Sequence, residues 1–385
     1  MKVAFVYDRV NKWGGAERVL LALHKIFPDA PLYTSVYHPE KAEWARVFDV
    51  RTSFVQKFPF AKSFHELYAT SMPLAFESFS FDGYDLVISV TSEAAKGIIT
   101  RPGTLHICYC LTPTRYLWSG YGEYFKNPIL RFISAPFVWY LRAWDKIASQ
   151  RPDRIIAISK EVQKRIKKYY GRDSEIIYPP VMINSYSASV SQPVTSNVKR
   201  QAIREAKTST QDDRLYFLIV SRLVPYKKID LAVSVFNKLD LPLKIIGKGS
   251  EESRLKAMAK SNVEFLGNLT DSDLVKYYKG CRALIFPGIE DFGLSILEAQ
   301  SFGKPVIAYR QGGALESVVP GKTGILFAPQ TSGALEKAVK KFLKMSSKGG
   351  SASGGKFDPR DCVMNAQKFS LTEFKRKLEE AITDN

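Results

Sequence analysis

Short apolar runs alternate with amphipathic segments along both halves of the chain. The runs have the length of buried strands, and the segments after them repeat apolar residues every three or four positions, as one face of a helix does. The expected strands of the first half are 3–7, 32–36, 86–90, 106–110, 154–158 and 176–178. Those of the second half are 215–220, 243–247, 263–266, 283–286, 305–309 and 324–327. This alternation predicts an α/β fold with parallel sheets and helices on both faces.

Two such halves suit a chain of 385 residues, which is long enough for two domains that each bury a core. We predict doubly wound, Rossmann-like domains over 1–183 and 213–360. The segment 184–212 between them is rich in Ser and poor in large apolar residues, so it is typical of a linker. A Gly- and Ser-rich stretch at 346–356 predicts a loop, and 359–382 predicts a helix.

Charge and composition narrow the classes of function. The net charge of +18 favours a phosphate-bearing partner, which could be a nucleotide, a nucleic acid or an anionic membrane. Helix-turn-helix, RRM-like and zinc-finger signals are absent, which disfavours nucleic acid. No apolar run reaches the ~18–20 residues of a spanning helix, and the first residues are typical of a strand rather than a signal peptide. We therefore expect a cytoplasmic protein. We expect reduced, structural thiols, not a metal site, at Cys108, Cys110, Cys281 and Cys362.

The most informative segment is GIEDFGLSILEAQ (288–300), which follows the expected strand 283–286 and becomes helical, with Leu294, Leu297 and Ala299 facing inward. A strand that enters a helix through a Gly-containing turn presents free backbone N–H groups, and the helix dipole adds positive charge, so the turn suits a phosphate. Glu290 and Glu298 bracket this turn. Carboxylates there make sense as acceptors for hydroxyls, so the pattern predicts a sugar nucleotide as the ligand.

This pair matches the paired-glutamate motif of the retaining glycosyltransferases of family 4. The chain resembles that family also in SRLVPYKKIDLAV (221–233), FLGNLTDSDL (265–274) and GKPVIAYRQGGALESV (303–318). The resemblance implies the GT-B fold, in which two facing domains form a cleft, the C-terminal domain binds the donor and the N-terminal domain receives the acceptor. It also implies that a last helix, 361–385, packs back on the N-terminal domain.

The resemblance assigns catalytic roles to three charged residues. Arg222 and Lys227 would stabilise the diphosphate leaving group without a metal, and Glu290 would accept hydrogen bonds from the transferred sugar. Glu298 would accept from the ribose hydroxyls. The other donor-binding residues implied are Gly14, Gly15, Lys228, Gly247, Asn268, Leu269, Asp291, Phe292, Gly293 and Leu294. Neither a metal nor another cofactor is expected.

The segment HICYCLTPTRYLW (106–118) resembles a mannosyltransferase-like branch, in which a histidine commonly stands at the position of Leu111. Leucine cannot make a polar contact with the donor, so Thr112, Thr114 and Arg115 remain the polar candidates. The favoured function is metal-independent, retaining transfer of a hexose, with GDP-mannose as the favoured donor and a glycan or lipid-linked hydroxyl as the acceptor. A sugar-nucleotide 2-epimerase of the same architecture and a basic nucleic-acid-binding protein are the alternatives.

Aromatic residues concentrate in two stretches, 54–81 and 116–144, and most are expected in the core. Basic residues concentrate in 151–172, which predicts a helix over 160–170 with the apolar stripe Val162, Ile166 and Tyr169. Aromatics beside Lys and Arg also suit anionic lipid headgroups. A peripheral contact of the N-terminal domain with the inner face of the cell membrane is therefore a hypothesis.

Overall fold

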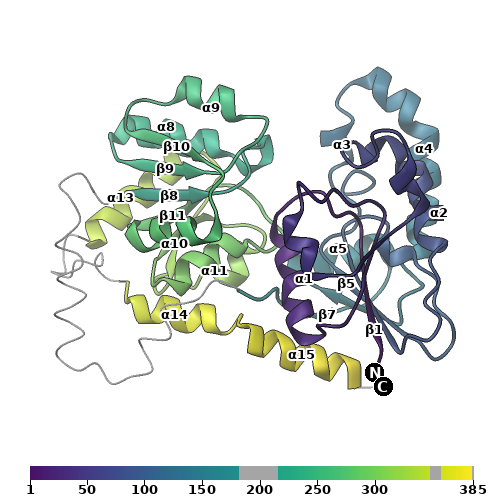
Figure 1. Cartoon of the computed structure of the whole chain (residues 1–385). Coiled ribbons are helices and arrows are strands. Elements are labelled where there is room, and N and C mark those ends of the chain that lie inside the picture. Colours follow the sequence, from purple (N-terminus) through teal and green to yellow (C-terminus); the bar gives the residue numbers. More distant parts are fainter. Residues whose placement is uncertain (182–215, 347–356, 384–385) are drawn as a thin grey trace. The chain divides into compact units, whose positions relative to one another are not determined.

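The computed structural model describes residues 1–181, 216–346 and 357–383. The predicted linker 184–212 and the predicted loop 346–356, apart from Ser346, lie outside the described residues. The chain divides into two compact units (Figure 1). Unit 1 comprises Met1–Pro180 and Phe374–Asn385, and unit 2 comprises Val181–Glu373.

Unit 1 contains a parallel sheet that, within the described residues, has seven strands in the order β3-β2-β1-β4-β5-β6-β7. The strands are β1 (Val3–Tyr7), β2 (Leu32–Thr34), β3 (Val50–Thr52), β4 (Leu86–Thr91), β5 (Leu105–Cys110), β6 (Arg154–Ala157) and β7 (Glu175–Ile176). The chain proceeds outward from β1 in one direction and then from β4 in the other. The loops after β1 and β4 therefore flank the point where the strand order reverses, which is where doubly wound sheets bind ligands.

Helices cover the sheet of unit 1 (Figure 1). They are α1 (Gly15–Ile26), α2 (Met72–Glu77), α3 (Tyr121–Tyr124), α4 (Pro128–Ala148), α5 (Lys160–Tyr170) and α15 (Leu371–Thr383). Short 3-10 helices are η1 (Glu43–Val47), η2 (Phe54–Lys57), η3 (His65–Ser71) and η4 (Ala95–Gly97). The Ser159 hydroxyl caps the start of α5, and Gly171 ends it in the left-handed conformation. The buried stripe of α5 continues to Tyr170, so the prediction of Tyr169 was wrong by one position.

Unit 2 contains a second parallel sheet, with six strands in the described residues in the order β10-β9-β8-β11-β12-β13. The strands are β8 (Phe217–Val220), β9 (Leu243–Ile246), β10 (Val263–Gly267), β11 (Ala283–Phe286), β12 (Val306–Tyr309) and β13 (Gly324–Phe327). The helical elements are η5 (Pro225–Lys227), α8 (Ile229–Leu239), α9 (Glu252–Met258), α10 (Asp271–Gly280), α11 (Leu294–Ser301), α12 (Ala314–Ser317), α13 (Ser332–Ser346) and α14 (Pro359–Gln367). Here the strand order reverses between β8 and β11.

Both faces of the unit 2 sheet are apolar, which explains why its strands are continuous hydrophobic runs. Phe217 of β8 packs with Phe236 of α8 on one face, and Leu218 packs with Ile296 of α11 on the other. The four cysteines are buried free thiols, as expected. The predicted α/β fold with two Rossmann-like domains is confirmed.

The expected helix over 359–382 is two helices, α14 and α15, which are separated by residues 368–370. The Ser370 hydroxyl accepts a hydrogen bond from the Glu373 N–H at 3.3 Å, and such a cap starts a new helix. In unit 2, the Asn365 amide of α14 donates to Gln300 Oε1 at 2.7 Å. In unit 1, Phe374 of α15 meets the ring of Tyr109 edge-on at 5.9 Å.

Candidate active site

The strand reversal of unit 2 gathers most of the predicted donor-binding residues. Arg222, Lys227 and Lys228 lie in the loop after β8, and residues 290–293 lie in the loop after β11. The backbones of these loops approach closely, because a Cβ atom on Gly288 would lie 2.7 Å from Lys227 Cα. Glycine is therefore required at position 288 for the two loops to meet.

An ion pair joins the two loops across the reversal. The ammonium group of Lys227 contacts Glu290 Oε1, and the side chains are 9% and 25% exposed. The Lys227 Nζ also lies 5.1 Å from the centre of the Tyr226 ring. Two of the three predicted catalytic residues thus touch each other, and Glu290 is the more exposed of the two.

The remaining cations of the first loop are exposed. Arg222 is exposed, and its guanidinium donates to the Tyr226 hydroxyl at 2.6 Å. Lys228 is exposed and has a left-handed backbone with φ of 52° at the start of α8. Tyr226, which the sequence did not single out, links Arg222 to Lys227 by contacting both.

Helix α11 begins at the predicted phosphate position. Gly293 precedes it with φ of 86°, a left-handed conformation that favours glycine, and as the N-cap residue it offers no side chain to cap the first turn. Ile296, rather than the half-buried Leu294, faces the core with Leu297 and Ala299, which corrects the predicted inward stripe. The resulting helix N-terminus carries the dipole charge that suits a phosphate.

A third loop, after β12, fixes the position of the motif. The Gly313 N–H donates to the Glu290 carbonyl at 2.9 Å. A Cβ atom on Gly312 would lie 2.4 Å from that same carbonyl oxygen. The ring of Phe292 is buried against Phe369 at 5.6 Å, so only the backbone of Phe292 is placed to meet a ligand. Asp291 is half-buried beside it.

Glu298 is held more tightly than the sequence indicates. Its side chain lies on α11 and is 4% exposed. The Tyr278 hydroxyl of α10 donates to Glu298 Oε2 at 2.6 Å. One carboxylate oxygen is thus engaged by the protein, and the predicted contact with ribose stays a prediction. The Tyr278 ring stacks on Phe302 at 5.8 Å, which fixes its hydroxyl in place.

The loops after β9 and β10 complete the same edge of the sheet. Gly247 has φ of 132°, and a Cβ atom there would lie 1.9 Å from the Ser221 carbonyl oxygen, so only glycine fits. Its N–H donates to the Gly267 carbonyl at 2.7 Å. Asn268 is exposed and Leu269 packs partly against the core. The predicted residues of unit 2 therefore lie on loops that share one edge.

The strand reversal of unit 1 is occupied by a buried carboxylate. Asp8, which follows β1, accepts hydrogen bonds from the Thr91 hydroxyl at 2.8 Å, the Ser92 N–H at 2.7 Å and the Ala95 N–H at 2.9 Å. Burial, and then the charge of Glu93, raises the pKa of the Asp8 carboxyl. Asp8 thereby fastens the loop after β4 to the end of β1.

The predicted glycine loop lies after the same strand. Gly14 is half-buried and extended, with φ of 179°, and Gly15 begins α1. Neither conformation requires glycine. Nearby, the buried Glu17 accepts a hydrogen bond from the Tyr7 hydroxyl at 2.6 Å, and burial raises the Tyr7 pKa well above its usual value. The contacts of Gly14 and Gly15 assign them no ligand, so their role stays a prediction.

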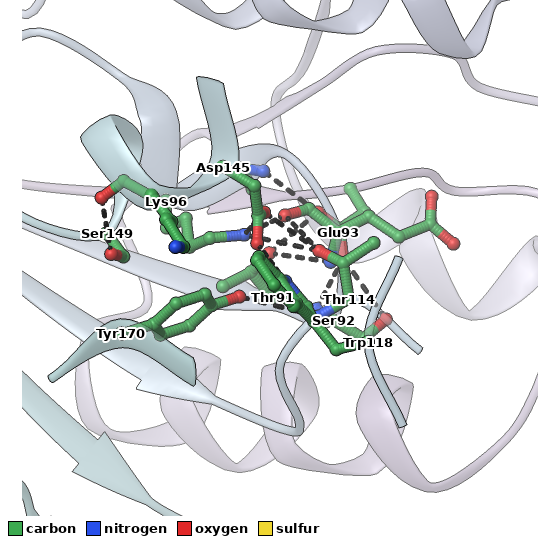
Figure 2. Close-up of polar contacts among 12 residues, drawn as sticks. Thr91, Ser92, Glu93, Lys96, Thr114, Trp118, Asp145, Ser149 and Tyr170 are labelled. Atoms are coloured by element: carbon green, nitrogen blue, oxygen red, sulfur yellow. Dashed lines mark hydrogen bonds and ion pairs between the residues drawn. The ribbon is translucent and has the colours of Figure 1, made fainter. Parts of the chain in front are cut away.

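A second polar cluster lies beside this reversal (Figure 2). Lys96 of η4 forms an ion pair with Asp145 of α4 at 2.5 Å, and their side chains are 3% and 1% exposed. Asp145 also accepts from the Thr114 hydroxyl at 2.9 Å and from the Trp118 indole N–H at 2.7 Å. Of the polar candidates in the loop after β5, Thr114 therefore belongs to a buried network. Sequence reasoning missed Lys96 and Asp145, although Asp145 is the only acidic residue between Tyr124 and Arg151.

The other residues of the loop after β5 make weaker contacts. Arg165 of α5 donates to the Thr112 hydroxyl at 3.4 Å. Arg115 is half-buried. Leu111 is half-buried, and its N–H donates to the Thr91 carbonyl at 2.8 Å, so its backbone extends the sheet pairing. These contacts assign no ligand role to Leu111.

Two parallel-sheet units with this strand order define the GT-B fold. The model of the family described as Glycosyltransferase Family 4 matches residues 13–184, and that of Glycosyl transferases group 1 matches 200–352. The chain belongs to the family 4 glycosyltransferases.

Individual relatives are similar to this chain at modest identity. The alpha-1,3/1,6-mannosyltransferase ALG2 of Mus musculus is 25% identical over 67% of this chain and 64% of its own length. A GDP-mannose-dependent monoacylated alpha-(1-6)-phosphatidylinositol monomannoside mannosyltransferase of Corynebacterium glutamicum is 28% identical over 45% of this chain and 48% of its own. The chain spans 35% to 64% of the length of the curated relatives compared.

Among solved structures, the crystal structure of Anabaena Alr3699/HepE in complex with UDP superposes with a TM-score of 0.68. The comparison covers 100% of both chains at 19% sequence identity, so it shows a shared fold.

Proposed function

We propose that this protein is a retaining, metal-independent glycosyltransferase that transfers a hexose from a nucleotide diphosphate to an acceptor hydroxyl. The observation that carries the proposal is the Lys227–Glu290 pair at the strand reversal of unit 2, which is partly exposed through Glu290 and lies beside the start of α11 at Gly293. A cation and a helix N-terminus suit a diphosphate, and a carboxylate suits sugar hydroxyls. Membership of family 4 supports this assignment.

The proposed reaction uses these groups together. The diphosphate lies at the start of α11, and Lys227 and Arg222 stabilise the charge that develops on it. The bond between the anomeric carbon and the phosphate oxygen breaks, and the acceptor oxygen bonds to that carbon on the same face. The acceptor proton passes to the departing phosphate oxygen. Glu290 exchanges its contact with Lys227 for hydroxyls of the transferred sugar.

GDP-mannose is the donor we propose. The C. glutamicum relative is described as GDP-mannose-dependent, and the mouse relative as a mannosyltransferase, which supports mannose. HepE binds UDP, so the fold itself accommodates more than one base. The acceptor we propose is a glycan or lipid-linked hydroxyl, used in the cytoplasm at the inner face of the cell membrane.

Calorimetric titration with GDP, UDP and ADP in the presence of EDTA tests the donor site. We expect GDP to bind most tightly, and Lys227→Met to weaken that binding. Preference for UDP or ADP would discard mannose as the donor, and no binding of any of the three would overturn the site.

Transfer itself is tested with radiolabelled GDP-mannose and a bacterial membrane lipid extract, and NMR of the product reports the anomeric configuration. If the donor is converted to an epimer when no acceptor is present, the protein is instead a sugar-nucleotide 2-epimerase.

A further inference from the structure

Helix α4 carries apolar side chains on two opposite sides. At about 100° per residue, Val138, Leu141 and Asp145 project from one side of the helix. These three residues are buried and attach α4 to the rest of unit 1. The opposite side is also apolar. Near its C-terminal end Trp144 packs on the core of unit 1 and donates to Glu77 at 2.8 Å, whereas the other large apolar residues of this side are exposed. Figure 1 shows α3 and α4 (blue) at the outer margin of unit 1.

The uncovered side is large and aromatic. Its exposed residues, with their exposed fractions, are Ile129 (69%), Leu130 (50%), Phe132 (84%), Ile133 (61%), Phe137 (56%), Trp139 (75%), Tyr140 (45%) and Ile147 (62%). The expectation that most aromatics of 116–144 lie in the core was therefore wrong for this stretch. Exposed apolar side chains in one contiguous arc mark an interaction surface rather than the scattered apolar residues of an ordinary surface.

The charges around this arc have one sign. No Asp or Glu occurs in 124–144, while Lys126, Arg131 and Arg142 do. Together with Lys146, Arg131 and Arg142 project from one flank of the arc at about 100° per residue. Lys126, Arg131 and Lys146 are exposed. An apolar arc with aromatic residues and a basic border is the pattern of a helix that lies in the interface of an anionic bilayer.

We propose that this face of α4 inserts into the surface of a membrane rich in anionic lipid, with Phe132 and Trp139, its most exposed side chains, among the anchors. Charge complementarity commits the surface to a bilayer rather than to a second copy of the chain, which carries the same net positive charge of +18. No helix in the described residues is long and apolar enough to span a bilayer, so an in-plane helix is the arrangement that fits.

The anchorage of α4 extends the inference to the acceptor. Asp145 projects from the inner side of the helix and holds Lys96 and Thr114 in the loops after β4 and β5 (Figure 2). When α4 lies on the bilayer, the helix itself would separate these loops from the lipid surface by one helix diameter, ~10 Å. This step rests on the proposed function. If the protein is a glycosyltransferase, the short distance to the bilayer favours an acceptor hydroxyl on a lipid-anchored molecule over one on a free soluble glycan.

Vesicle flotation tests the surface without nucleotide or acceptor. The full chain should float with vesicles that contain phosphatidylglycerol and less with pure phosphatidylcholine, and high salt should weaken the difference. Phe132→Ser with Trp139→Ser should lower partitioning by roughly a hundredfold. The matched control, Val47→Ser with Met364→Ser, removes apolar side chains that are 55% and 63% exposed elsewhere, and it should float like the unaltered chain.

Three results would overturn the proposal. The unaltered chain could fail to float with anionic vesicles, or the Phe132 and Trp139 variant could float equally well. Sedimentation equilibrium could instead show a dimer that this variant dissociates, which would make a second copy the occupant. The GDP titration is run on the same variants, so loss of nucleotide binding and loss of flotation report separately on the proposed function and on this surface.

Discussion

The two sheets reverse their strand order in the same way, yet the two reversal points are filled differently. In unit 1, Asp8 is engaged by a hydroxyl and backbone N–H groups, and the neighbouring Lys96 and Asp145 side chains are 3% and 1% exposed. In unit 2, the Lys227 and Glu290 side chains are 9% and 25% exposed, beside a helix start whose N-cap residue is Gly293. The same topology thus supports a fully buried polar cluster in one unit and a partly exposed one in the other.

The Lys96 and Asp145 side chains of unit 1 are paired because an unpaired buried charge costs free energy. A buried charge is tolerated when it is paired and its hydrogen bonds are made. Burial by itself lowers the pKa of Lys96, but the charge and hydrogen bond of Asp145 outweigh it, so the pKa of Lys96 is raised. Because the folded pKa is raised, this pair stabilises the fold at neutral pH, and that contribution is lost only as the pH rises through the folded pKa.

The largest effect should come from breaking the buried pair. Lys96→Met should lower the free energy of unfolding by about 3–5 kcal/mol, because it leaves Asp145 as an uncompensated buried charge. Replacing both residues, as Lys96→Met with Asp145→Leu, should cost less than the sum of the two single changes. Denaturant unfolding monitored by circular dichroism measures these differences.

Lys25→Met is the control for this prediction. Lys25 is an exposed residue of α1. Its replacement should change the free energy of unfolding by about 0.5 kcal/mol or less. If Lys96→Met had an equally small effect, the buried pair would contribute nothing to stability. The two reversal points would then not differ in what their ion pairs do for the fold.

Replacing the lysine of the unit 2 pair by methionine should lower activity strongly and stability little. Lys227→Met should reduce the rate of hexose transfer by about 10²–10³-fold, because it removes a cation aimed at the developing phosphate charge. Its effect on the free energy of unfolding should stay below about 1 kcal/mol, since Glu290 is partly exposed and water can solvate it. Transfer kinetics and thermal unfolding of one preparation measure both quantities.

Lys279→Met, at an exposed position of α10, serves as the matched control and should leave transfer unchanged. Should Lys227→Met unfold the protein, or transfer as fast as the unaltered enzyme, the Lys227–Glu290 pair would be structural after all.

Acid should distinguish the two reversal points further. His65 of η3 is 6% exposed, and its Nδ1 lies 3.4 Å from Asn11 Nδ2 in the loop after β1. Burial, and then the charge of Arg9, lowers the pKa of His65 to about 4. The unfolded chain therefore binds more protons than the folded one between the two pKa values. Stability should fall as the pH drops from about 6.5 to about 4, by up to about 3 kcal/mol.

Denaturant unfolding across this pH range measures the loss. His65→Gln should remove most of the His65 contribution to the slope, while its stability at pH 8 reports the separate cost of the substitution. An unchanged slope in His65→Gln would assign the acid sensitivity to other groups, such as carboxylates whose pKa is lowered in the folded chain.

Much of the fold could be predicted from the periodicity of the sequence. The bounds of α5, β11 and β13 agree with the prediction to the residue, and α5 is bounded by the caps Ser159 and Gly171. Strand β3 was missed, since Val50–Thr52 is short and half-exposed. Periodicity identifies an apolar face but cannot tell whether protein covers it, which is why the exposed side of α4 was assigned to the core.

The candidate site could be predicted only where neighbouring residues carry a motif. Lys227 and Glu290 were found through such segments, and the structure brings them into contact. Lys96, Asp145 and Tyr278 were missed because their partners are distant in the sequence. No local pattern indicates that Tyr278 of α10 bonds Glu298 of α11, and only the packing of the two helices on one sheet face brings them together.

The smallest predicted effect tests that last contact. Tyr278→Phe keeps the buried ring and its stacking on Phe302 but removes the hydroxyl that donates to Glu298. A hydrogen bond to a charged group contributes about 1.5–3 kcal/mol, and part of it is recovered by rearrangement, so we expect GDP binding to weaken by about three- to tenfold. Tyr277→Phe, at the half-buried neighbouring position, is the matched control and should bind GDP normally. Calorimetry gives both affinities. Equal weakening in the two variants would show that α10 acts through general packing, whereas weakening in Tyr278→Phe alone would show that unit 2 orients its buried carboxylate for the nucleotide, as unit 1 orients Asp145 for the fold.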